Sequence, residues 1–156
     1  AKFFHWGFVI LFIYAVAKQV DNINQLEDIN FLRFEMIFGL IFLILLVIRL
    51  IYMKTTQKTS IPEDATKSQK IVAKIIHNGM YVLLGMTVLS GLFIGCLFWL
   101  EIKNGFVLDT VIIIHELVIN LLYFFIGIHI FAATYHRFKK DGVWSSMVPF
   151  LKEKID

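Results

Sequence analysis

Four long apolar runs, separated by three short polar stretches, dominate the pattern of this chain. The runs cover about residues 3–20, 31–53, 71–100 and 107–137. Each approaches or exceeds the roughly 20 residues that a helix needs to cross a bilayer. They are continuously apolar rather than alternating, which favours helices over the strands of a membrane barrel. The pattern therefore predicts an all-α, integral membrane four-helix bundle that forms a single domain over residues 1–156.

Composition agrees with a chain that is dissolved in lipid. Hydrophobic residues make up 58% of the sequence and charged residues 17%, whereas a soluble domain carries about a quarter charged residues. The first run lacks a small-residue cleavage site, so we expect a retained helix and not a signal peptide. The lone cysteine, Cys96, is expected to be a small buried apolar residue of the third run.

The charges that flank the runs predict how the chain is oriented. Basic residues gather between the second and third runs and at the C-terminal end, and acidic residues gather on the other side. By the positive-inside rule, the middle loop and both termini of this multi-pass protein are cytoplasmic. Because the basic residues flank helices and form no single patch, no nucleic-acid partner is expected. The basic residues in question are Arg49, Lys54, Lys58, Lys67, Lys70, Lys74, Arg137, Lys139, Lys140, Lys152 and Lys154.

All five histidines fall within or at the edge of the apolar runs, where ionisable side chains are costly and indicate function. His115 and His129 are fourteen residues apart, which on a helix separates them by ~21 Å along the axis. At ~100° per residue they return to within ~40° of the same face. Two stacked ligands on one helix are what two haems placed across a bilayer require.

Depth in the membrane suggests partners for these histidines. With the N-terminus inside, His5 and His129 lie at similar depth and could ligate one haem iron from opposite sides. His77 and His136 lie nearer the cytoplasmic surface. They fit either a quinone site, because imidazole exchanges protons near neutral pH, or an interfacial anchor.

Several motifs agree with one known family, and they cover nearly the whole chain. On these residues the chain resembles the bacterial cytochrome b561 family, which includes a membrane superoxide oxidase and is related to the cytochrome b subunits of hydrogenases. The most specific segment is HELVINLLYFFIGIHIFAATYH, from His115 to His136. The weaker motifs are His5-Trp6 in the first run, the G-x9-R spacing from Gly39 to Arg49 in the second, and His77 with Gly91 in the third.

The resemblance implies two b-type haems in a bundle of four helices. The inner haem falls on His5 and His129. The outer haem falls on His115 and a histidine of the second run, four residues before Gly39, where this sequence has Glu35. The outer haem is then absent or weakly ligated by Glu35, and in its absence Glu35 and His115 could form a hydrogen-bonded pair.

The function that the resemblance implies is electron transfer between a periplasmic donor, superoxide among the candidates, and a membrane quinone such as ubiquinone. Whether the chain is itself a quinone oxidoreductase stays open. The alternative is a haem-binding anchor, a cytochrome b subunit of a larger respiratory complex. A transporter without haem would leave the spacing of His115 and His129 unexplained.

Overall fold

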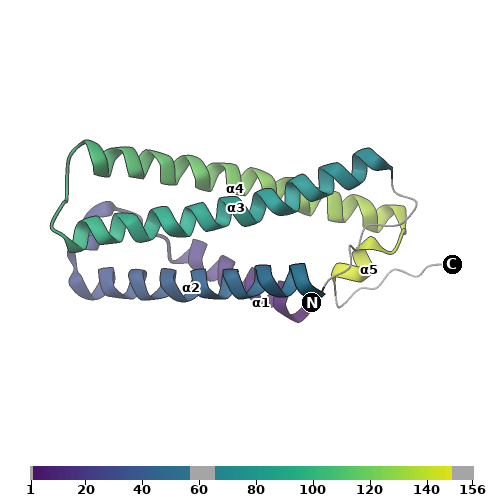
Figure 1. Cartoon of the computed structure of the whole chain (residues 1–156), viewed down its shortest axis with the longest axis horizontal. Helices are drawn as coiled ribbons and strands as arrows, with labels where there is room; N and C mark the ends of the chain where they lie inside the picture. The colour runs from purple at the N-terminus through teal and green to yellow at the C-terminus, as the bar shows by residue number, and fades with distance from the viewer. Residues whose placement is uncertain (1, 57–65, 149–156) are drawn as a thin grey trace.

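The structure is a computed structural model, and it describes residues 2–56 and 66–148. Within these ranges every regular element is a helix. The long helices α2, α3 and α4 run side by side and connect as antiparallel neighbours, with α3 in contact with both others (Figure 1). The elements are α1 (Lys2–Ala17), the 3-10 helix η1 (Ile23–Glu27), α2 (Ile29–Thr56), α3 (Lys67–Trp99), α4 (Phe106–Lys139) and the short α5 (Val143–Met147).

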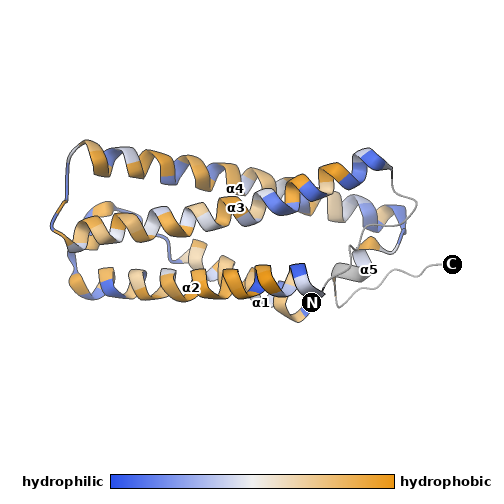
Figure 2. Cartoon of the chain, in the orientation of Figure 1, coloured by the Kyte–Doolittle hydropathy of each residue, from blue (hydrophilic) through white to orange (hydrophobic). Residues whose placement is uncertain are grey.

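Three of the helices, α2, α3 and α4, are long and apolar enough to cross a membrane. Figure 2 shows their apolar middles and the polar residues that gather near their ends. The fourth predicted span, α1, is apolar but has 16 residues, or ~24 Å of helix. That is shorter than the ~30 Å hydrocarbon layer. The all-α membrane fold is therefore present, with three full-length candidate spans among the described residues.

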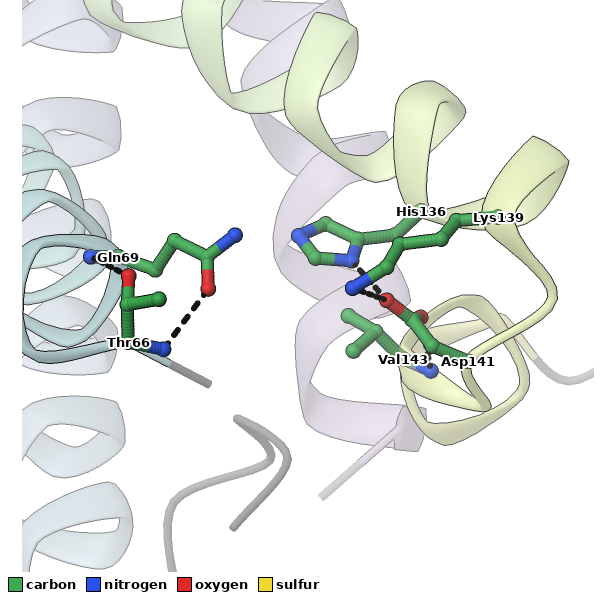
Figure 3. Close-up of polar contacts among 6 residues, drawn as sticks. All are labelled: Thr66, Gln69, His136, Lys139, Asp141 and Val143. Carbon is green, nitrogen blue, oxygen red and sulfur yellow. Dashed lines mark hydrogen bonds and ion pairs between the residues drawn. The ribbon is translucent and has the colours of Figure 1, made fainter. Parts of the chain in front are cut away.

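The helix ends differ from the predicted ones where polar side chains cap the backbone. The first helix ends at Ala17 instead of residue 20, and the Asn22 side chain then accepts from the Asn24 N–H (2.9 Å) to begin η1. The third helix begins at Lys67 instead of residue 71. There Thr66 and Gln69 form a reciprocal capping box, drawn in Figure 3, that satisfies free N–H groups of the first turn.

The tightest core lies at the end of the bundle that holds η1. It joins η1 and the start of α2 to the end of α3 and the start of α4. Along the rest of the helices most large apolar side chains are exposed; Phe131, for example, is 74% exposed. This distribution suits a bundle that is surrounded by lipid, since apolar side chains can face the bilayer. The core residues are Leu26, Leu32, Ile94, Leu97, Phe98 and Leu108.

Helix α1 is held mainly by aromatic side chains. In the described residues the backbone of α1 packs closely against none of the other elements. Its rings reach across instead: Phe8 meets Phe42 of α2 at 5.1 Å between centroids, and Phe12 meets Tyr123 of α4 at 6.5 Å. Helix α1 therefore stands away from α2 and α4 at a distance that long side chains fill.

The burial of Cys96 and the positions of three lysines were also predicted from the sequence. Cys96 is exposed, so the prediction that it is buried was wrong. It lines an open hollow between α3 and α2, together with Met36 and Ile37 of α2. Lys58, Lys152 and Lys154, which contributed to the predicted orientation, lie outside the described residues.

Candidate functional site

Three histidines from three helices meet at the end of the bundle where α1 begins and α4 ends. The His5 ring of α1 and the His129 ring of α4 have centroids 6.3 Å apart, with 68° between their planes. The His77 ring of α3 lies on His129 as well, at 5.1 Å. All three side chains are half-buried. Residues that lie more than a hundred positions apart in the sequence thus form one cluster.

The spacing of these rings distinguishes between two axial pairs. A metal–imidazole bond is about 2 Å long and the ring centre lies about 1 Å further out, so two imidazoles that share one iron have centroids about 6 Å apart. The 6.3 Å between His5 and His129 fits this requirement, whereas 5.1 Å between His77 and His129 is too short. In the described residues no three His, Cys, Asp or Glu side chains are grouped to hold a bare metal ion. A haem needs only two, since its porphyrin supplies the other four nitrogens.

Arg49 of α2 closes one side of this cluster. Its Nη2 donates to His5 Nδ1 at 2.9 Å, and its Nε donates to the Tyr81 hydroxyl at 3.0 Å. Its Nη1 donates to the carbonyls of Phe4 (3.1 Å) and His5 (3.3 Å). The guanidinium also lies over the ring of Phe8, 5.0 Å from its centroid. A fixed cation therefore stands directly beside the His5 ring.

At the opposite end of the bundle, His115 is oriented by α3. The Ser90 hydroxyl donates to the Met86 carbonyl at 2.7 Å, so its oxygen is left to accept from His115 Nδ1, also at 2.7 Å. A proton on Nδ1 leaves the lone pair on Nε2, which is the form that binds a metal. A Cβ at Gly91 would stand 3.3 Å from His115 Cε1, so the glycine lets the ring lie close against α3.

Glu35 lies on α2, and its Oε1 is buried without a hydrogen-bond partner. The hydrogen-bonded pair with His115 that the sequence allowed is not formed, because His115 is bonded to Ser90 instead. The neighbouring Met36 packs against Gly95 of α3. Burying a carboxyl oxygen without a hydrogen bond costs free energy. An atom that binds Glu35 Oε1 would lower that cost.

A comparison with known protein families decides the identity of the fold. The family model described as prokaryotic cytochrome b561 matches residues 1–150. The chain belongs to the prokaryotic cytochrome b561 family. Membership makes it a membrane protein of b-type haem electron transfer, and the ring spacing of His5 and His129 fits that cofactor. Neither the curated proteins nor the solved structures contained a match to the chain.

In this b561 chain, the last histidine, His136, belongs to a separate polar group formed by the last turn of α4 and the turn that follows it. Its Nδ1 lies 2.6 Å from Asp141 Oδ2, and Asp141 also accepts from the Val143 N–H at 3.3 Å (Figure 3). Lys139 Nζ approaches the same Oδ2 at 3.5 Å. The quinone site predicted at His77 and His136 stays a prediction. His77 lies in the cluster with His129, and His136 fastens α5 to α4.

Sequence reasoning missed four side chains that complete these sites. Arg49 was taken as one of the charges that set orientation, although it ends the G-x9-R motif inside an apolar run. Tyr81 and Ser90 are ordinary helix residues, and no pattern indicated that Tyr81 would bond to Arg49 or Ser90 to His115. Asp141 carried one usable signal: an acidic residue within a basic C-terminal stretch.

We expect the contact between Asp141 and His136 to survive moderate acid and to fail only in strong acid. Burial raises the pKa of Asp141, but hydrogen bonds from His136 and from the Val143 N–H outweigh burial, so the pKa lies below its ordinary 3.8. A carboxyl with a lowered pKa stabilises the fold above its ordinary pKa and loses that contribution as the pH falls through the lowered value. The hydrogen-exchange protection factors of the α5 amides, which are corrected for the intrinsic pH dependence of exchange, should therefore fall only below pH 3.8.

The variant Asp141→Asn should lower these protection factors at neutral pH, because it removes about 1 kcal/mol of a charge-assisted hydrogen bond at a partly exposed site. Glu101→Gln is the matched control, since the ion pair of Glu101 with Lys103 (2.6 Å) lies in the loop between α3 and α4. Protected α5 amides in Asp141→Asn would contradict this role.

Proposed function

We propose that this chain is a four-helix b-type cytochrome that passes electrons between a periplasmic donor and membrane quinone in a bacterial inner membrane. One observation carries the proposal: His5 and His129, from the first and the last long helix, have ring centroids 6.3 Å apart. They would be the axial ligands of a six-coordinate, low-spin haem b. In this arrangement α1 lies in the membrane with the other three helices, and both chain ends are cytoplasmic.

The protein's own residues fix this site. Helices α1 and α4 each bring one imidazole to it, and the aromatic contacts of α1 hold the two helices at this distance. A bound haem supplies one-electron chemistry at its iron, and the two histidines set its ligation.

Contact with quinone would lie at the cytoplasmic end, near His77 and His136. Asp141 accepts from His136 Nδ1, which leaves Nε2 of that ring to exchange a proton with a reduced quinone. His77 stands beside His129. In this proposal it lies between the haem ligands and the quinone, and superoxide or another periplasmic reductant would enter from the opposite end.

The test is a reduced-minus-oxidised spectrum of the purified chain, with haem quantified per chain and quinol added as reductant. A low-spin b-type spectrum with at least one haem per chain, reduced by quinol, is the expected result. A purified, folded chain with no haem would refute the proposal.

Glu35 favours a second candidate, a haem-binding subunit of a larger respiratory complex. A carboxylate at the usual position of an outer ligand would suit a chain whose outer redox partner belongs to another subunit. Recovery of the detergent-solubilised chain in a complex with a haem or iron–sulfur subunit would distinguish this candidate from the free-standing cytochrome.

The outer haem site expected between His115 and residue 35 leads to a separate prediction. Ser90 leaves the lone pair of His115 on Nε2, so one imidazole is in place, and Glu35→His supplies the missing one. We expect haem per chain to rise, or a weakly ligated outer haem to become bis-histidine with a higher potential. Met36→His is the control, because Met36 packs on Gly95. No change in stoichiometry, spin state or potential in Glu35→His would show that side chains fill the outer cavity.

A further inference from the structure

The Arg49 guanidinium is a cation without an anion in the described part of the chain. None of the ion pairs formed there includes it. Its acceptors are two backbone carbonyls, a phenol oxygen and a neutral imidazole. Arginine inside a membrane bundle is expensive and is normally paired. A half-buried, firmly held guanidinium of this kind is suited to receive a carboxylate.

The contact between Arg49 and His5 restricts the state of the imidazole. Arginine has only donors, so His5 Nδ1 must accept, and the proton of the neutral ring stands on Nε2. An iron bound at Nε2 requires that proton to move to Nδ1, where it would face an N–H of Arg49. An iron bound at Nδ1 would take the lone pair that Arg49 now uses. In both cases, ligation by His5 frees Arg49 Nη2.

We propose that Arg49 then binds a propionate of the haem that His5 holds. Every b-type haem carries two propionate carboxylates, and the freed Nη2 of Arg49 could donate a charge-assisted hydrogen bond to one propionate oxygen. The other bonds of Arg49, to Tyr81 and to the α1 carbonyls, would keep the side chain in place during the exchange. Arg49 is thus a cofactor-positioning residue, and this role rests on the proposed haem at His5.

The first experiment compares haem with its dimethyl ester, in which both propionates are neutral. Haem is extracted from the purified wild-type chain, and the two forms are rebound, with native haem as the reference. We expect wild type to prefer native haem by about tenfold, the size of one carboxylate–guanidinium pair of about 1.4 kcal/mol. Equal binding of the two forms by wild type would overturn the proposal.

The second experiment measures the reduction potential of the haem in variants as purified. Arg49→Gln should lower the potential, since it removes a positive charge beside the cofactor, and it should abolish the preference over the ester. Arg49→Lys should retain much of both. Arg33→Gln is the matched control: Arg33 lies at the other end of α2, over Trp99. An unchanged potential in Arg49→Gln would also refute the proposal.

These outcomes are separable from failure of the proposed function. If no haem is bound, or if the spectrum does not depend on His5, the haem assignment fails. If haem is bound through His5 but esterification changes nothing, only the role of Arg49 fails. The ester comparison uses the wild-type chain, so it stands even where Arg49→Gln does not fold.

Discussion

Replacing His129 by alanine should abolish the low-spin b-type spectrum of the purified chain. His129 is the ring that both other histidines of the cluster approach, and its 6.3 Å spacing from His5 fits a shared iron. Loss of one axial ligand leaves the site five-coordinate or empty. His5→Ala should have the same effect. Optical spectra and a haem assay on matched amounts of protein measure the change.

His77→Ala is the decisive companion to these variants. Its ring lies 5.1 Å from that of His129, too close for the two to flank one iron. We therefore expect His77→Ala to keep a bis-histidine spectrum and to alter mainly the exchange of electrons with quinone. If His77→Ala lost the haem while His5→Ala kept it, the axial pair would be His77 and His129.

The second large effect is expected at Gly79 of α3, which lies directly against Phe125 of α4. A Cβ on Gly79 would overlap the ring of Phe125, which lies one turn before His129 on α4. Gly79→Ala must displace that ring, and overpacking of this kind costs about 1–3 kcal/mol. We expect a lower midpoint of thermal unfolding in detergent and a weakened haem spectrum, because the displaced ring disturbs His129.

Gly85→Ala is the control for this prediction. It lies on the same helix, and its Cβ would stand 3.9 Å from Leu46 Cδ2, an ordinary contact. Because both changes replace glycine by alanine inside α3, both gain the same helix propensity. A Gly79→Ala chain as stable as Gly85→Ala would show that Phe125 yields without cost.

The sequence predicts how far along a helix a residue lies far better than it predicts which way that residue faces around the helix axis. Counting residues along helices places His5 and His129 at one level, and the structure brings their rings within reach of each other. Counting could not show that His77 faces them, because the rotation of α3 about its axis depends on close packing such as that of Gly79 against Phe125. For the same reason counting could not show that His115 bonds to Ser90 and not to Glu35, the pair that the sequence allowed if the outer haem is absent.

The sequence likewise predicts where a helix lies better than it predicts the residue at which the helix ends. Apolar length located α2, α3 and α4 to within a few residues, but caps such as Thr66 and Asn22 set where helices begin or stop. The attachment of α5 by Asp141 depends on one left-handed residue, Lys140, and on Gly142 with its positive φ. Such a turn is a local event that hydropathy does not record.

The placement of the two proposed ligands has a consequence for how the protein is made. His5 lies on α1 and His129 lies on α4, so the helix with His5 leaves the ribosome well before the helix with His129. Nascent chains emerge in order and fold from the N-terminal side, so a half-made bundle exposes an imidazole that has no counterpart. If the proposed ligation holds, haem binding through both histidines must follow translation of α4, and a chain cut short before His129 would lack one of the two proposed ligands.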